Sequence, residues 1–146
     1  MSYSSAEDLR RRIGFSVFDE IYNVPDGSDL SDRSDIADDL ESAAAEIDGA
    51  LAFRYSLPVT GERSLALLKD WNLTLAEERA YARAAGSEFA EKIKRRADQV
   101  RKYLEMIRAD QFRLPDAAEN AASSGGGIAL VKRDDPVFDR KSMEGF

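Results

Sequence analysis

Carboxylates are the side chains of this sequence whose spacing comes closest to that of a chemical site. Aspartate recurs at every third position of one polar stretch, at Asp26, Asp29, Asp32 and Asp35. A calcium loop between two helices needs oxygen ligands at alternate positions and a glutamate at the twelfth. Counted from Asp29, the alternate positions hold Ser31 and Arg33, so the pattern does not fit. We therefore expect no metal here, and we expect serine and aspartate to cap the helix that follows.

The rest of the sequence offers little else for catalysis. The chain contains neither histidine nor cysteine. This excludes disulfides and thiol nucleophiles, and it removes the usual zinc ligands and the usual general base near neutral pH. Adjacent carboxylates occur at Asp38/Asp39 and Asp134/Asp135, but neighbours in sequence do not share one helix face. We expect a protein that is not an enzyme and that uses no cofactor.

Length and charge narrow the class further. The chain has 146 residues, 43% of them hydrophobic, which suits one domain with a substantial core. No apolar run of about 18 residues occurs, so we expect no membrane partner. The net charge is −7; acids gather in residues 1–50, whereas bases outnumber acids in residues 51–115. Such a chain is not suited to grip the DNA backbone, which requires clustered lysine and arginine.

Two short helices are predicted at the start of the chain. Ser4 and Glu7 have the spacing of a capping box, and Gly14 is placed to end the helix that they begin. One face at helical spacing is then formed by Phe15, Phe18, Ile21 and Tyr22. This second helix ends before the turn sequence Pro25-Asp26-Gly27, and a polar loop continues to Asp35.

Three longer helices follow. The first covers about residues 32–54 and ends before Leu57-Pro58, the second covers residues 64–84, and the third is capped by Ser87. In the second, one side carries Leu68, Trp71 and Leu75. We expect a shared core whose key members are Ile36, Leu40, Ile47, Leu51, Ile93, Val100 and Leu104. The sequence thus predicts an all-α fold, a small bundle of four to five helices with long loops and an extended C-terminal tail.

Charge on the last helix admits two interpretations. Its outer face pairs acids with bases one turn later, at Glu88/Lys92, Glu91/Arg95 and Asp98/Lys102. The basic run 92–96 could instead indicate contact with nucleic acid. Because each base has an acid one turn away, a solvated face is favoured. A helical regulatory or nucleic-acid-binding protein stays open as the alternative function.

The amino-acid composition of the sequence changes after Leu114-Pro115. We expect a helical domain over residues 1–115, and a flexible linker with an extended docking tail over residues 116–146, because residues 117–127 are rich in alanine, serine and glycine. Apolar residues beyond such a linker do not pack easily in their own core. The residues predicted to bind a partner are Ile128, Leu130, Val131, Phe138, Arg140, Lys141, Met143 and Phe146. A tail that folds back on its own domain is the alternative.

Residues 44–58 carry a resemblance to a known family. They resemble the Mu-like phage neck proteins, in which a helix of the form A-x-x-E-I-D-x-x-L runs into R-Y-x-L-P. Residues 3–9 with Gly14, and Phe138-Asp139-Arg140 with Gly145-Phe146, resemble the same family. The likeness covers most of residues 3–113 and the tail. Ala50 stands where the family commonly has an aromatic residue, and residues 70–83 match loosely.

The resemblance implies a structural virion protein, similar to the head–tail adaptor or connector subunits of long-tailed phages. Those helical subunits form a homo-oligomeric ring, expected to be twelve-fold, between the portal protein and a stopper or tail-completion protein. The implied location is the head–tail junction of the virion, and the host cytoplasm during assembly. DNA would pass through the channel without specific binding. We expect acidic side chains, rather than basic ones, to line the channel. They would come from the loop that holds Asp26, Asp29, Asp32 and Asp35.

Overall fold

The computed structural model describes residues 2–84 and 90–120 of the chain. Within this part it contains five α-helices: α1 (Ala6–Ile13), α2 (Phe15–Tyr22), α3 (Ser34–Leu51), α4 (Glu62–Arg83) and α5 (Ala90–Arg108). The same residues form no β-strand beyond an isolated bridge between Tyr55 and Glu119. The predicted all-α fold is confirmed. None of the helices in these ranges combines the length and the apolar character that crossing a bilayer requires.

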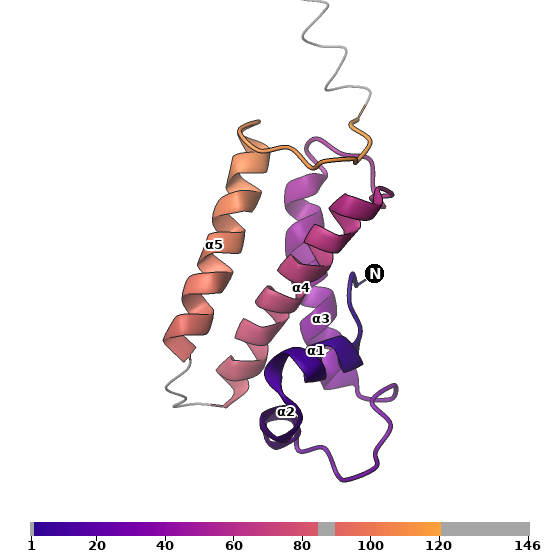
Figure 1. The fold of residues 1–146 in the computed structure, drawn as a ribbon, viewed down its shortest axis with the longest axis vertical. Coiled ribbons are helices and arrows are strands. Elements are labelled where there is room, and N and C mark those ends of the chain that lie inside the picture. Colours follow the sequence, from indigo (N-terminus) through magenta and orange to yellow (C-terminus); the bar gives the residue numbers. More distant parts are fainter. Residues whose placement is uncertain (1, 85–89, 121–146) are drawn as a thin grey trace, which may run out of the picture.

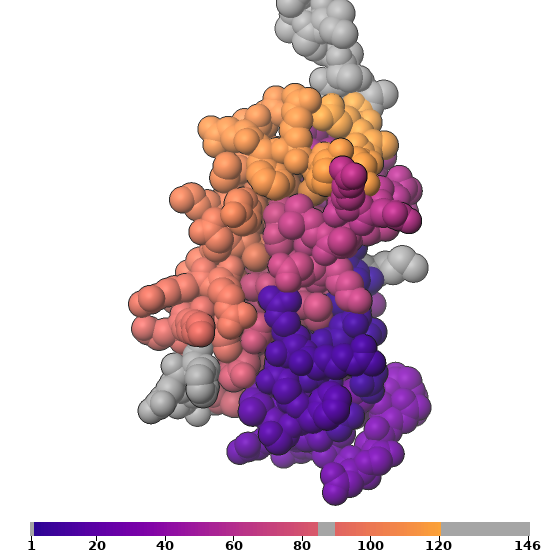
Figure 2. Space-filling view, in the orientation of Figure 1, coloured from indigo at the N-terminus to yellow at the C-terminus, as the bar shows by residue number. Residues whose placement is uncertain are grey.

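The three long helices form the body of the molecule, and α4 contacts each of the other four helices. In Figure 1, α4 runs obliquely between α3 and α5, while α1 and α2 cover its lower end. The segment after α5 crosses the upper end of the bundle and reaches the loop between α3 and α4. Figure 2 shows the same segment in orange, covering the upper end of the body. The N-terminal helices and the C-terminal segment therefore cover opposite ends.

The first turn of α1 differs from the prediction by one residue. Ser5, not Ser4, is the cap: its hydroxyl accepts a hydrogen bond from the Asp8 N–H, and the Asp8 carboxylate accepts one from the Ser5 N–H at 3.0 Å. The predicted pair of Ser4 with Glu7 is wrong because the Ser4 hydroxyl donates instead to the Asn72 side chain. Gly14 ends α1 as predicted, with a φ of 105° that glycine adopts readily.

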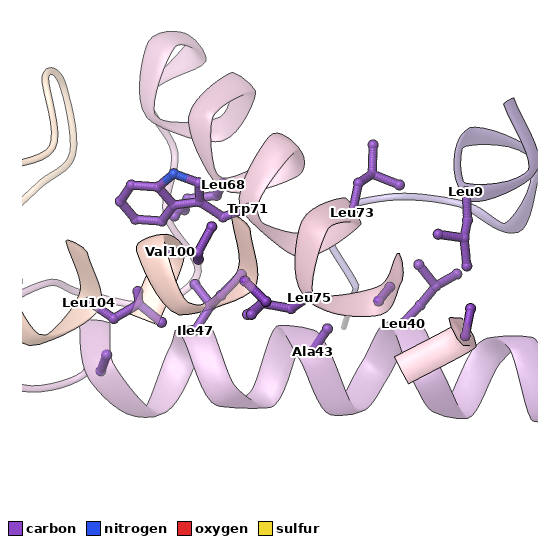
Figure 3. Close-up of a cluster of buried hydrophobic side chains, with 14 of the residues drawn as sticks. Leu9, Leu40, Ala43, Ile47, Leu68, Trp71, Leu73, Leu75, Val100 and Leu104 are labelled. Atoms are coloured by element: carbon purple, nitrogen blue, oxygen red, sulfur yellow. The ribbon is translucent and has the colours of Figure 1, made fainter. Parts of the chain in front are cut away.

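The predicted core is confirmed. All seven of its key members are buried: Ile36, Leu40, Ile47, Leu51, Ile93, Val100 and Leu104. Figure 3 shows Leu40, Ala43 and Ile47 on one side of α3, facing residues of α4 and α5. Ala43 is fully buried, and this small residue lets α4 approach α3 closely. The stripe at helical spacing therefore marks the side of α3 that the other helices cover.

The segment between α2 and α3 is polar outside and fixed by apolar residues inside. Val24 and Leu30 are buried in the core. Arg33 donates a hydrogen bond to the Tyr22 carbonyl and pairs with Asp35 at 2.8 Å. The prediction that Asp35 belongs to the loop is wrong. Asp35 is the second residue of α3, where its carboxylate also accepts a hydrogen bond from the Ile36 N–H. The helix begins later than expected because Arg33 remains extended.

An aromatic cluster joins α4, α5 and the segment after α5. The Trp71 and Tyr103 rings are stacked, with centroids 5.7 Å apart and planes inclined by 6°. Phe112 lies against both rings, at 6.0 Å from Trp71 and 5.4 Å from Tyr103. Aromatic pairs at such distances stabilise a core beyond the area that they bury. This cluster fixes where the chain leaves α5.

Residues 114–120 lie along the loop that follows α3. The Leu114 N–H donates to the Tyr55 hydroxyl at 2.8 Å, the Ser56 N–H to the Ala118 carbonyl at 3.0 Å, and the Asn120 N–H to the Arg54 carbonyl at 2.7 Å. The first residues of the segment predicted to be a flexible linker, 116–120, are thus hydrogen-bonded to the helical body.

Asp116 supplies the cap that α4 lacks locally. The N-cap residue Gly61 has no side chain, and the Asp116 carboxylate accepts hydrogen bonds from the Arg63 and Ser64 N–H groups at 2.9 and 2.8 Å. A hydrogen bond with the Ser64 side chain first, and the bond from the Arg63 N–H second, hold the pKa of Asp116 below its usual value. A Cβ on Gly61 would lie 2.1 Å from the Asp116 carboxylate, so only glycine leaves room for this cap.

We predict that Asp116→Ala lowers the melting temperature at neutral pH, because two helix N–H groups lose their acceptor. A carboxylate whose pKa is lowered in the folded state stabilises it above the unfolded pKa of 3.8, and this contribution is lost as the pH falls through the folded pKa. The difference from wild type should therefore shrink in acid. Thermal melts at several pH values would show this, with Asp38→Ala as the control at an exposed position. Equal melts of Asp116→Ala and Asp38→Ala would contradict the prediction.

Candidate interaction site

A groove of about 700 Å³ opens beside the first turns of α4. Its apolar lining is formed by Leu57, Pro58, Val59, Leu65 and Ala66, and its polar lining by Ser2, Tyr3, Asp48 and Lys69. Figure 1 shows the three segments that supply these residues, the N-terminal stretch, the α3–α4 loop and the start of α4, on the same side of the bundle. The volume is typical of pockets that hold an apolar group of moderate size.

Two large apolar side chains of the groove remain open to solvent. Leu57 is 40% exposed and Leu65 is 37% exposed, whereas Val59 is buried and belongs to the core cluster. Exposed apolar area that gathers in a concave place, with polar groups around it, is typical of a contact surface for another protein. The groove can therefore accept apolar side chains from a partner.

The wall of the groove is held by polar contacts of the N-terminal stretch. The Tyr3 hydroxyl donates to the Asp48 carboxylate, and the Ser2 hydroxyl contacts the Asn72 side chain at 3.1 Å. Asn72 is fully buried, and its amide donates to the Leu40 carbonyl. Burial, together with the bond to Asp48, raises the pKa of the Tyr3 hydroxyl well above its usual value. Tyr3 therefore stays neutral and remains a donor throughout the physiological range.

Two further aromatic side chains are exposed elsewhere. Phe15 on α2 is 57% exposed, and Phe53 after α3 is 69% exposed. Each lies under a guanidinium, Arg10 at 4.7 Å from the Phe15 ring and Arg108 at 5.3 Å from the Phe53 ring. A cation over an aromatic face is attractive but leaves the ring edge free for other contacts. Both rings are additional places where another protein could bind.

The charged residues of α5 take part in an ionic network that joins three helices. Arg101 lies 2.6 Å from Glu46 of α3 and 2.6 Å from Glu78 of α4, and Arg79 lies 3.3 Å from Glu46. These bonds, to Glu78 first and to Glu46 second, raise the pKa of Arg101. Arg101 therefore ties the three long helices together and has its charge matched inside the protein.

The basic run 92–96 is divided by the fold. Ile93 is buried, and Arg96 lies 3.8 Å from the Glu77 carboxylate, while Lys92, Lys94 and Arg95 are exposed. Asp98 pairs with Arg101 at 3.4 Å instead of with Lys102 as predicted. Some of the basic side chains that could indicate nucleic acid binding, Arg96 and Arg101, thus form ion pairs with other helices.

A second ionic contact fixes α2 on α3 and α4. Asp39 is only 8% exposed and accepts hydrogen bonds from the Tyr22 hydroxyl at 2.6 Å and from Arg83 at 2.7 and 2.9 Å. Burial first, and then the bond to Asp39, raises the pKa of Tyr22. As expected, Asp38 and Asp39 do not act as a pair, because Asp38 is exposed while Asp39 is buried.

Glu77 is a buried carboxylate between α1 and α5. It is 5% exposed, and its nearest bases are Arg12 at 3.6 Å and Arg96 at 3.8 Å. Burial raises its pKa, and the two arginines offset this only in part. The folded state therefore prefers Glu77 protonated, relative to the unfolded chain. The stabilising contribution of the proton is full below the unfolded pKa of 4.5 and is lost as the pH rises through the folded pKa.

We predict that Glu77→Gln removes this pH dependence. The free energy of unfolding of both proteins is measured between neutral pH and about pH 4. As the pH falls, the value for wild type should rise relative to the value for Glu77→Gln. Subtracting the two curves cancels the acid effects of all other carboxylates. Glu41→Gln, at an exposed position of α3, is the matched control, and the change for Glu77→Gln should exceed the change for Glu41→Gln. A flat difference for Glu77→Gln would contradict the prediction.

The structure places the predicted site residues as follows. Asp26, Asp29 and Asp32 are exposed in the loop before α3. Asp29 accepts the Ser31 N–H at 3.0 Å, which lowers the pKa of Asp29. Asp35 belongs to α3 and pairs with Arg33, so it is not one of the loop acids. The residues predicted to bind a partner, from Ile128 to Phe146, lie outside the described residues.

The groove is the feature that sequence reasoning missed. Tyr3, Leu57 and Leu65 lie far apart in the sequence, and no periodic pattern links them. One local signal was available, because Leu57-Pro58-Val59 is an apolar run at a place where a turn is expected to be polar. Apolar residues at such a turn indicate that the turn is covered by something.

Comparison with known proteins gives one result. A family model described as Bacteriophage Mu, Gp36 matches residues 3–132. The match covers all five helices, every lining residue of the groove except Ser2, and the segment that caps α4. A search of curated proteins finds no match.

Proposed function

The chain belongs to the bacteriophage Mu Gp36 family, and we propose that it is a structural virion protein, a head–tail adaptor subunit that forms a ring between the portal protein and the tail-completion proteins. The observation that carries this proposal is the family match along the whole helical body. The likeness of its sequence to phage neck proteins supports the finer role. A protein with this role acts by forming interfaces with other proteins, not by catalysing a reaction.

The surface of the subunit supports a role in protein contacts. The groove at the start of α4 and the exposed rings of Phe15 and Phe53 are apolar places on different elements. A ring requires a heterologous interface, in which one surface of a subunit meets a different surface of its neighbour. Acids concentrated in residues 1–50 and bases in residues 51–115 suit such a contact, since patches of opposite charge meet between neighbours.

DNA is proposed to pass through the ring without being held. A phosphate backbone that moves through a channel should meet no strong attractive sites, because lysine and arginine would retain it through counterion release. The exposed acids Asp26, Asp29 and Asp32 are the proposed channel side of the subunit. In this proposal the protein acts at the head–tail junction of the virion, and it is assembled in the host cytoplasm.

The proposal is tested by imaging the full chain with and without the portal protein of the same phage. We expect light scattering to show mostly monomers or loose oligomers alone, and negative-stain images to show a ring on the portal. Segments that order on binding weaken association of the free subunit. A tight closed dimer that portal does not change would overturn the proposal. A gel shift with DNA across a salt series tests the alternative, since tight, strongly salt-dependent binding would favour nucleic acid recognition.

A further inference from the structure

The groove beside α4 needs an occupant, and the chain carries a candidate. Its apolar lining, including the half-exposed Leu57 and Leu65, faces solvent in the described subunit. Beyond residue 120 the sequence continues with Gly125-Gly126-Gly127, and its last nine residues include the large apolar residues Phe138, Met143 and Phe146. We propose that the groove of each subunit receives these apolar residues from the C-terminal segment of a neighbouring copy. This inference rests on the proposed ring.

The place where the described chain ends brings this segment close to the groove. The Ala118 carbonyl accepts a hydrogen bond from the N–H of Ser56, which directly precedes the groove residue Leu57. The Asn120 N–H donates one to the Arg54 carbonyl. The C-terminal segment thus starts from the same loop that forms one wall of the groove. Its starting point is fixed by the hydrogen bonds of residues 114–120 and by the Asp116 cap on α4.

The direction of the chain at this point favours a neighbouring groove over its own. Glu119 faces Tyr55 in an antiparallel bridge. From Ala118 to Asn120 the chain therefore runs from Ser56 back toward Arg54, which is away from residues 57–59. A segment that entered its own groove would have to reverse, whereas one that continues outward leaves the subunit.

The length of the segment is sufficient. The 18 residue-to-residue steps from Asn120 to Phe138 can reach about 60 Å when extended. The 22 residues of α4, the longest described helix, span about 33 Å. The segment can therefore cross from one subunit to the next. Because the groove and the segment are different surfaces, each copy donates one and accepts one, which is the head-to-tail contact that closes a ring.

The chemistry of the two partners is complementary. The groove offers aliphatic side chains and the proline ring at residues 57–59 and 65–66. Two phenylalanines and a methionine are side chains that bury large apolar areas in such places. Lys69 lies on the rim at 3.1 Å from Asp8, with 46% of its side chain exposed, and Glu144 is near the end of the segment. Contacts between rim charges would select the orientation more than they add affinity.

Cross-linking tests the contact directly, because the chain has no cysteine of its own. Ala66→Cys places a thiol in the groove, and Ser142→Cys places one in the C-terminal segment of a second batch of full chain. The two batches are mixed, assembled on the portal protein of the same phage and treated with a short bismaleimide. Ala82→Cys is the matched control, an exposed alanine about 24 Å further along α4.

We expect a cross-linked dimer for Ala66→Cys with Ser142→Cys, and about tenfold less for Ala82→Cys with Ser142→Cys. Replacing Phe138, Met143 and Phe146 by serine in the Ser142→Cys chain should lower the yield by about tenfold as well, since anchor residues carry most of such a contact. A ring without this cross-link overturns the inference and leaves the proposed function standing. A third batch, whose chains carry both Ala66→Cys and Ser142→Cys, would also overturn the inference if it cross-linked only within single chains. Failure to form any ring overturns the proposed function and this inference together.

Discussion

Leu51→Ala is expected to lower the free energy of unfolding by about 2–5 kcal/mol, the cost of deleting a fully buried leucine side chain. Leu51 is 0% exposed at the end of α3 and belongs to the core cluster shared by α3, α4 and α5. Its carbonyl also accepts the Arg54 and Tyr55 N–H groups, which start the loop that forms the groove. A cavity at this position would therefore weaken both the core and the support of the groove.

Leu65→Ala is the matched control for this change. The same atoms are deleted from α4, but Leu65 is 37% exposed, so we expect a loss of less than about 1 kcal/mol. Urea titrations followed by the fluorescence of Trp71, the only tryptophan, would measure both variants. Trp71 is buried and stacked on Tyr103, so its emission reports on the interface of α4 with α5. Equal midpoints for wild type and Leu51→Ala would show that the assigned core face of α3 is wrong.

The fold was predictable because long amphipathic helices leave a strong pattern. The stripe from Ile36 to Leu51 recurs at helical spacing, and only one side of α3 can hold it. Glycine and proline mark the ends: Gly14 ends α1, and the segment at Leu57-Pro58 follows α3. The cap of α1 was misplaced by one residue because Ser4 and Ser5 are both competent caps. The choice between them depends on Asn72, which is distant in the sequence.

Contacts between distant residues could not be predicted. Asp116 caps a helix that begins more than fifty residues earlier, and a sequence rich in alanine around it indicates a linker. Asp39 has the same local surroundings as Asp38, and only the packing of Tyr22 and Arg83 makes it a buried acceptor. The groove shares this origin, since Tyr3, Leu57 and Leu65 meet only after the bundle has formed. Periodicity determines the side that a helix buries, but not which polar residue meets which.

The second large effect is expected from deletion of residues 125–146. The described body should remain folded, because its last hydrogen bonds are made by Asn120 and its core lies entirely between residues 9 and 114. Helix content and melting temperature should therefore match those of the full chain. Joining of heads to tails should be lost, because the deleted residues include every apolar side chain that the sequence places beyond the glycine linker.

A pull-down of the portal protein by the truncated subunit measures this effect. Residues 122–146 can extend to about 80 Å, which is enough to pass a neighbour and reach the portal. Its contacts are expected to combine burial of Phe138, Met143 and Phe146 in the groove of the neighbouring copy with addition of the β-prone residues 128–131 to an exposed sheet edge of the portal. A full-length chain with the three apolar residues replaced by serine separates these two contributions, since it keeps residues 128–131. If the truncated protein binds portal as well as wild type does, the helical body makes the docking contact and the segment serves only the contact between neighbouring copies.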